Sequence, residues 1–182
     1  ALDVGWVEED RYDLTPADYL TMALGKTGYY SGISPLRIGG LIGGATTEQL
    51  CALEAFGKNS AIAFQIQDDV LNIVGEEAVV GKDLLNDILE SKRTLMVIHC
   101  LNEAGPTDVE RLHELLRMGH EKEPRHVDEI VALLNRYDSI GYARRLARDL
   151  IVEARTHLED LPNSRARTVL ASMADFFLER EL

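Results

Sequence analysis

The stretch IAFQIQDDVLNIV, from Ile62 to Val74, decides the fold of this chain. On a helix that advances about 100° per residue, its side chains separate into two arcs. One arc, about 100° wide, carries the polar residues: Gln65, Asp68, Asp69 and Asn72. A separate arc carries the apolar residues: Ile62, Ala63, Ile66, Val70, Ile73 and Val74. The sequence therefore predicts a helix with one packed face and one oxygen-rich face.

Helix start and stop signals surround this stretch. Thr15-Pro16 marks a helix start, with Thr as the N-cap and Pro at the first helical position, and this helix is expected to carry Lys26. Pro35 is expected to interrupt the helical pattern after Lys26. The long helix is predicted from Thr46-Thr47-Glu48 to near Gly75, and a loop is predicted over residues 76–87.

The C-terminal part of the chain also has the helical period. A helix is predicted from near Glu90 to just before Gly105-Pro106, and Thr107 with Glu110 reads as a capping box. Further helices are expected after Pro124, over residues 140–160 and over residues 164–181. No alternating strand pattern is found, so the predicted fold class is all-α.

The composition fits one globular domain. The chain has 182 residues, of which 46% are hydrophobic, enough for a real core. Without a signal peptide or an apolar run near the ~20 residues that span a bilayer, we expect a cytoplasmic protein without stable membrane insertion. Cys51 and Cys100 lie in apolar helical surroundings and are expected to be buried and reduced. His113, His120 and His126 have no metal-ligand spacing and are expected at the surface.

The net charge of −12 limits the possible partners. It argues against non-specific nucleic-acid binding, which needs a basic surface. A polyanionic substrate would be repelled unless a divalent cation inverted the local charge.

Asp68 and Asp69 offer the carboxylate oxygens that Mg²⁺ prefers, and Lys82, Asp87 and Lys92 come later along the chain. This order suits a site for a magnesium-bound diphosphate. An adjacent acidic pair is also typical of a solvated helix face, and this alternative stays open for the pair alone.

These motifs together resemble a known family. The pattern Phe64-Gln65-x-x-Asp68-Asp69-x-x-Asn72, then Gly81-Lys82, then Asp87-x-x-x-x-Lys92-x-Thr94, is similar to the second aspartate-rich region of trans-isoprenyl diphosphate synthases. Upstream, Lys26-Thr27-Gly28 matches the Lys-Thr segment of the same family. The resemblance extends from about Gly5 to the C-terminus.

The resemblance implies an isoprenoid-synthase helical bundle and a Mg²⁺-dependent reaction. In this family an allylic diphosphate ionises, isopentenyl diphosphate attacks the cation, and a proton is lost. The resemblance makes Asp68 a direct Mg²⁺ ligand, and it makes Asp69 and Asp87 members of the metal site that orient metal-bound water.

The resemblance also gives roles to the cationic and neutral polar residues. It makes Lys26 and Lys82 diphosphate-binding cations, and it gives Lys92 a place in the substrate site, where it holds the acidic cluster. Thr27 and Gln65 would direct oxygen dipoles at the allylic cation. Lys26, Thr27, Gln65, Asp68, Asp69 and Lys82 are thus the expected catalytic residues.

The family has another aspartate-rich motif upstream of the Lys-Thr segment. By resemblance, residues 1–182 are the C-terminal part of a single domain whose N-terminal half is absent from this sequence. Two explanations stay open: the sequence is a fragment of a longer protein, or the other half is a separate chain. In either case we expect this chain to work with that half, and we expect complete subunits to form a homodimer.

Three positions depart from the family pattern. Asn72 replaces an aspartate, Trp6 stands where a glutamine is common, and Ser91 stands where a glycine is common before Lys92. Asn72 followed by Glu76 also approaches the second metal motif of class I terpene cyclases, which use the same all-α fold. A cyclase and a non-catalytic regulatory subunit therefore remain as alternatives.

Overall fold

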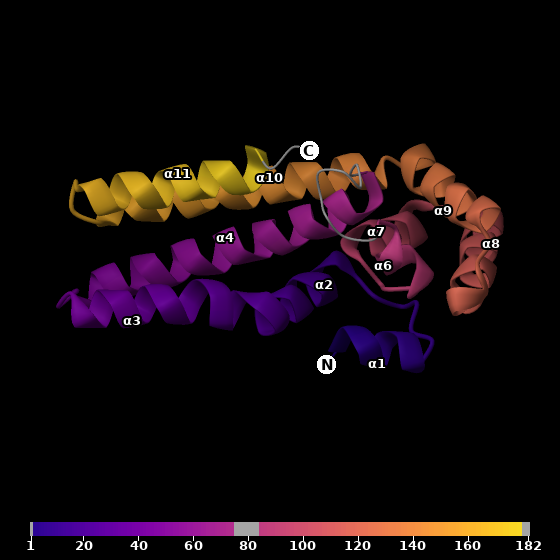
Figure 1. Ribbon diagram of the computed structural model, residues 1–182, viewed down its shortest axis with the longest axis horizontal. Helices are drawn as coiled ribbons and strands as arrows, with labels where there is room; N and C mark the ends of the chain where they lie inside the picture. Colours follow the sequence, from indigo (N-terminus) through magenta and orange to yellow (C-terminus); the bar gives the residue numbers. More distant parts are fainter. Residues whose placement is uncertain (1, 75–83, 180–182) are drawn as a thin grey trace. The chain divides into compact units, whose positions relative to one another are not determined.

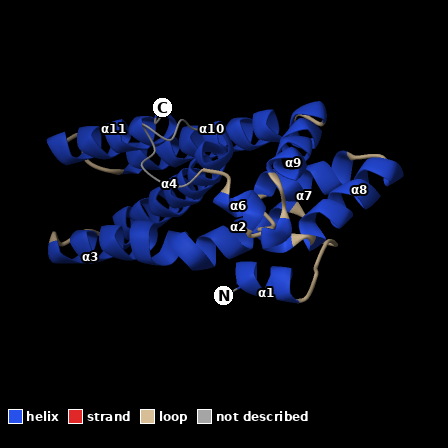
Figure 2. Cartoon of the chain, turned by 45° about the vertical axis from the view of Figure 1, so that its right-hand side comes forward, coloured by secondary structure: helices blue, strands red, loops and turns tan. Residues whose placement is uncertain are grey.

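The computed structural model describes residues 2–74 and 84–179 (Figure 1). Over these two ranges every regular element is a helix and no strand occurs (Figure 2). The predicted all-α class is therefore confirmed. None of the helices in the described ranges combines the length and the apolar composition that a membrane crossing requires.

The helices are distributed over both ranges. The first range contains α1 (Leu2–Glu8), α2 (Pro16–Ala23), the π-helix η1 (Leu24–Ile33), α3 (Ser34–Ile42) and α4 (Thr47–Val74). The second range contains α6 (Asn86–Leu89), α7 (Leu95–Glu103), α8 (Pro106–Arg117), α9 (Pro124–Arg136), α10 (Ser139–His157) and α11 (Arg165–Glu179). Short 3₁₀ turns occupy Gly119–Glu121 and Leu158–Asp160.

The chain forms two compact units. The first unit comprises the residues up to Met22 together with Asp68–Arg144, and the second comprises Ala23–Gln67 together with Arg145–Glu181. The borders between the units fall inside α2, α4 and α10, so these helices contribute to both.

Helix α7 supplies much of the core of the first unit. Its residues from Leu95 to Ile98 are all buried, so the helix is apolar all round, as expected of a helix with packing on every side. Helices α8 and α9 pack against α7 and against each other. They contribute the fully buried side chains Leu112, Leu115, Ile130 and Leu134.

In the second unit, η1 and α4 approach each other closely. A side chain on Gly32 would overlap the carbonyl oxygen of Gly57, so the two glycines allow backbone-to-backbone contact. Helices α10 and α11 run side by side, joined by an ion pair between Arg155 and Asp175 (Figure 1). Phe177 of α11 meets Phe64 of α4 edge to face, with ring centroids 5.3 Å apart.

The prediction for the long helix is confirmed. Helix α4 runs from Thr47 to Val74, and the apolar arc is buried, with Ile66 and Val70 fully inaccessible. The prediction for Pro35 is wrong, because Pro35 lies in the first turn of α3, where its missing N–H breaks no helical hydrogen bond. The regular α-helix is instead replaced by the π-helix η1 just before Pro35.

The predicted helix start near Glu90 is also wrong. The chain forms the short α6, then Ser91 adopts a left-handed backbone with φ of 55°, and α7 begins only at Leu95. Thr94 is the N-cap of α7, and its side chain accepts a hydrogen bond from Val97 N at 3.5 Å. A residue with positive φ cannot continue an α-helix, so the helix begins after it.

The capping box predicted at Thr107 is not formed, because α8 starts at Pro106 and its N-cap is Gly105, two residues before Thr107. A capping box is found instead at α9, where Glu123 and His126 each bond the backbone of the other. His126 is therefore buried rather than at the surface. Among the cysteines, Cys100 is buried as predicted, but Cys51 is exposed.

Candidate functional site

Asp69 is a buried carboxylate held by a tyrosine. Its residue is only 7% exposed, and its Oδ2 accepts a hydrogen bond of 2.7 Å from the hydroxyl of Tyr19 on α2. Burial and the charge of Asp69 raise the pKa of Tyr19 well above its usual value. The Tyr19 hydroxyl therefore stays protonated and can donate to Asp69. The alternative of a solvated acidic face is therefore wrong for Asp69, whereas the neighbouring Asp68 is half-buried.

Asn72 ties the end of α4 to the segment that carries Asp87. The side-chain oxygen of Asn72 accepts a hydrogen bond of 3.0 Å from Asp87 N, and its backbone oxygen accepts one of 2.8 Å from Leu85 N. An aspartate could accept the side-chain bond equally well. The departure to asparagine therefore keeps the acceptor and removes only the charge.

Asp87 and Lys92 form an ion pair in the first unit. Lys92 Nζ lies 2.7 Å from Asp87 Oδ1 and 2.8 Å from Glu90 Oε2. Burial alone would lower the pKa of Lys92, but the hydrogen bonds to Asp87 and Glu90 raise it above its usual value. The predicted contact between Lys92 and the acidic cluster is therefore present, in the form of its bond to Asp87.

In the second unit, Thr27 and Gln65 meet although they are 38 residues apart. Thr27 lies in η1, is buried, and donates a hydrogen bond of 2.6 Å from Oγ1 to Gln65 Oε1 on α4. The π-helical winding of this segment is notable because π-helical turns are frequent at functional sites. Lys26, the preceding residue, is exposed.

A cavity of about 350 Å³ adjoins Thr27 within the second unit. Helices η1, α3, α4 and α11 line it, mostly with apolar groups such as Phe56, Phe64 and Phe177. Thr27 thus lies between the amide of Gln65 and an apolar space.

The carboxylates of the described residues do not form an all-protein metal cage. Within residues 2–74 and 84–179, no three His, Cys, Asp or Glu side chains gather closely enough to hold a metal ion. Mg²⁺ is commonly bound by one or two carboxylates together with phosphate oxygens and waters. The half-buried Asp68 beside the anchored Asp69 fits that kind of shared ion. Lys82 lies outside the described residues, as does Gly81.

The serine at position 91, where the family commonly has glycine, is explained by a buried lysine, Lys122, that the sequence did not indicate. Ser91 Oγ donates a hydrogen bond of 2.6 Å to Leu116 O and accepts one of 2.6 Å from Lys122 Nζ. Lys122 also donates to Gly119 O at 2.9 Å, and burial, with the charge of Arg93, lowers its pKa to about 8. These bonds hold a serine at a left-handed position that would otherwise favour glycine.

Tyr19 was also missed as a site residue. The only sequence signal is general: a tyrosine on the apolar side of a helix needs a partner for its hydroxyl when it is buried. Nothing local indicates that the partner is a carboxylate 50 residues later. Trp6, the third departure, is a buried core residue of α1.

Comparisons with known proteins agree on one family. The family model for polyprenyl synthetase matches residues 1–134. The short chain isoprenyl diphosphate synthase of Methanothermobacter thermautotrophicus is 40% identical over 181 residues, covering 100% of this chain and 54% of that protein.

Solved structures are similar over nearly the whole chain. Geranylgeranyl pyrophosphate synthetase from Pyrococcus horikoshii is 36% identical with a TM-score of 0.87, covering 98% of this chain and 53% of that one. A geranylgeranyl pyrophosphate synthase from Corynebacterium glutamicum, complexed with isoprenyl diphosphate and magnesium, is 26% identical with a TM-score of 0.87, covering 99% and 50%.

The chain spans about half the length of these relatives. This coverage agrees with the expectation that it carries half of the fold. The family model covers most of the chain and matches the family indicated by the motifs. The resemblance is thus confirmed, and the chain belongs to the polyprenyl synthetase family.

Proposed function

We propose that the protein carrying this chain is a prenyltransferase that joins isopentenyl diphosphate to an allylic diphosphate. The observation that carries the proposal is the hydrogen-bonded series at the end of α4. Asn72 holds the backbone of Asp87, and Asp87 pairs with Lys92. The names of the relatives, and the magnesium and isoprenyl diphosphate bound to one of them, support the same activity.

In this proposal Asp68 binds Mg²⁺ directly, and Asp69 and Asp87 orient the water molecules that complete its coordination. When bound, Mg²⁺ neutralises the diphosphate as it leaves the allylic carbon, which is electrostatic stabilisation of developing charge. The ion pair with Lys92 limits the rotation of the Asp87 carboxylate. Lys92 also adds a positive charge at the edge of the diphosphate site.

Lys26 and Lys82 would contact the diphosphate as point charges. Lys26 lies at an exposed position, which suits a residue that contacts a substrate. Thr27 and Gln65 would stabilise the allylic cation with oxygen dipoles, and the hydrogen bond between them supports this role because it fixes both groups. The hydrocarbon part of the substrate needs apolar surroundings, which the cavity beside Thr27 provides.

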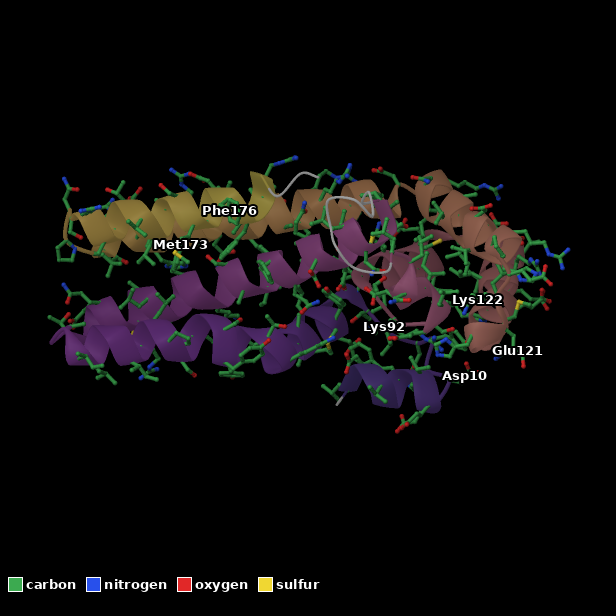
Figure 3. All side chains as sticks on the ribbon, in the orientation of Figure 1. Asp10, Lys92, Glu121, Lys122, Met173 and Phe176 are labelled. Atoms are coloured by element: carbon green, nitrogen blue, oxygen red, sulfur yellow. The ribbon has the colours of Figure 1, made fainter. Side chains whose placement is uncertain are left out.

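We further propose that residues 1–182 are part of a larger helical domain and that complete subunits form a homodimer. Apolar side chains remain strongly exposed on α3, where Ile38, Leu41 and Ile42 are 57%, 60% and 83% exposed. Another exposed row lies on α11 and includes Met173 and Phe176 (Figure 3). Contiguous exposed apolar surface usually marks an interaction site, so these rows are suited to the rest of the fold or to a second subunit.

A cytoplasmic location is part of the proposal. Cys51 and Cys100 are both free thiols, and Cys51 is exposed. A free exposed thiol suits a reducing compartment. The cyclase alternative gains no support, since Asn72 is engaged with the backbone of Asp87, and Glu76 lies outside the described residues.

The test uses the complete protein with labelled isopentenyl diphosphate, a series of allylic diphosphates and Mg²⁺. Elongated prenyl diphosphates are the expected products. Asp68→Ala should lower the rate by about 10²-fold or more, because it removes a ligand of the ion that stabilises the leaving group. Asp128→Ala, at an exposed aspartate on α9, is the matched control and should leave the rate unchanged.

Absence of elongated product with every allylic primer would contradict the prenyltransferase proposal. A rate that Asp68→Ala leaves unchanged would instead indicate the non-catalytic subunit, since a scaffold does not depend on a metal ligand. Cyclised product from a single allylic diphosphate would favour the cyclase.

A further inference from the structure

Tyr19 and Asp69 form a pair of buried polar groups in the core of the first unit. Tyr19 is 0% exposed and Asp69 is 7% exposed. Their oxygen atoms lie 2.7 Å apart, a normal length for a hydroxyl that donates to a carboxylate. The two residues come from different helices, so the bond depends on the tertiary fold.

Packing alone does not explain the hydroxyl of Tyr19. A phenylalanine would fill nearly the same volume, and the core would lose little in apolar burial. What the hydroxyl adds is a donor for a carboxylate that is costly to bury without one. The role of the Tyr19 hydroxyl is therefore to donate a hydrogen bond to Asp69.

The bond restricts how the Asp69 carboxylate can turn. One of its oxygens is fixed to a rigid phenol, and the phenol is itself held by complete burial. Groups that orient a ligand or a metal-bound water must have a defined direction, and removal of their supporting partners typically changes metal affinity by about 10- to 100-fold. Asp69 comes immediately after the proposed Mg²⁺ ligand Asp68 on α4.

We infer that Tyr19 is a positioning residue, which sets the direction of the Asp69 carboxylate for a divalent ion shared with a diphosphate. The inference rests on the proposed function. It adds to that site a residue from α2 that none of the acidic or Lys-Thr motifs contains.

The experiment compares Tyr19→Phe with Tyr137→Phe in the complete protein. Tyr137 donates a comparable hydrogen bond of 2.8 Å to Asp108 Oδ2, and neither of these residues is a proposed site residue. Binding of Mg²⁺ in the presence of inorganic diphosphate is measured by titration calorimetry, and thermal unfolding is measured on the same samples. Tyr19→Phe should weaken Mg²⁺ binding about 10-fold, raise the Mg²⁺ concentration for half-maximal rate, and lower kcat less. Tyr137→Phe should leave binding unchanged.

The outcomes separate this inference from the proposed function. If the wild-type protein fails to bind Mg²⁺ with diphosphate, the proposed function fails. If the wild type binds and Tyr19→Phe binds equally well, the inference is overturned, even when the variant is less stable.

A second comparison covers the case in which Tyr19→Phe does not fold. Asp69→Asn removes the charge, so Tyr19→Phe can be added to it without taking the phenol donor away from a buried carboxylate. If Tyr19 acts through Asp69, the double variant should bind Mg²⁺ as weakly as Asp69→Asn alone. A further loss of about 10-fold in the double variant would contradict the inference, because Tyr19 would then act on the ion by another route.

Discussion

Replacing Ser91 with glycine tests whether strain or hydrogen bonding dominates at this position. Ser91 has φ of 55°, a region where glycine is favoured over other residues by about 1 kcal/mol. The serine makes a bond of 2.6 Å to Leu116 O and receives one of 2.6 Å from Lys122 Nζ. Glycine would relieve the strain and lose both bonds.

The magnitudes decide the expected sign. The neutral bond to Leu116 contributes about 1 kcal/mol, and the bond from the ammonium of Lys122 contributes about 2 kcal/mol. Ser91→Gly loses both bonds, about 3 kcal/mol together, and relieves about 1 kcal/mol of strain. It should therefore lower the free energy of unfolding by about 2 kcal/mol. Ser91→Ala keeps the strain and loses both bonds, so it should be worse, by about 3 kcal/mol.

The assay is urea unfolding of the complete protein at one fixed protein concentration, because association would change apparent stability. The expected order is wild type, then Ser91→Gly, then Ser91→Ala. Ser172→Ala, at an exposed serine of α11, is the control and should change stability by about 0.5 kcal/mol or less. A glycine variant more stable than the wild type would refute the reasoning, as would an alanine variant equal to the glycine variant.

Three further changes can be tested by the same unfolding measurement. Because the folded state lowers the pKa of Lys122 to about 8, the unfolded chain binds more protons at alkaline pH. Stability should therefore rise by about 2 kcal/mol between about pH 7.5 and 9.5, and Lys122→Met should abolish the rise; an unchanged rise would contradict this. Asn72→Ala should cost about 1 kcal/mol, because Asp87 N loses its acceptor, whereas Asn72→Asp should cost less; equal losses would argue against the acceptor role. Gly32→Ala should cost about 2 kcal/mol or more, because its Cβ would overlap a backbone oxygen of α4, whereas Gly39→Ala, with open space around it, should be neutral or slightly stabilising; similar effects at both positions would exclude the close approach.

The long helix α4 could be predicted because its signal is periodic and extends over many residues. The apolar arc around Ile66 and Val70 is buried as the pattern required. The contact between Thr27 and Gln65 could be anticipated only through the resemblance to a family, since spacing along the chain says nothing about which helices meet. Once the family is known, the Lys-Thr segment and the aspartate-rich helix are expected to share a site.

The remaining features depend on forces that a local pattern does not contain. The π-helix at Leu24–Ile33 differs from an α-helix by small changes in winding that leave the hydrophobic pattern nearly intact. The left-handed backbone of Ser91 is stabilised by hydrogen bonds with Leu116 and Lys122, which lie 25 and 31 residues later. Such a pairing is specified by tertiary packing, so the start of α7 could not be located from the sequence.

The departures at Asn72 and Ser91 act on the same short segment. Left-handed residues, Leu85 and Ser91, stand before and after α6, with φ of 65° and 55°. Neither is glycine, so each conformation must be stabilised by its surroundings. A helix of only four residues cannot supply that stabilisation by itself.

The stabilisation comes from outside the segment, at both of its ends. Asn72 binds the backbone of Leu85 and Asp87 at the start, and Lys122 and α8 bind Ser91 at the end. The direction of the Asp87 carboxylate is therefore set by α4, α8 and Lys122 more than by α6. It follows that a substitution at Asn72 or Ser91 would change the proposed metal site by displacing Asp87, without either residue being a proposed ligand of the ion or the diphosphate.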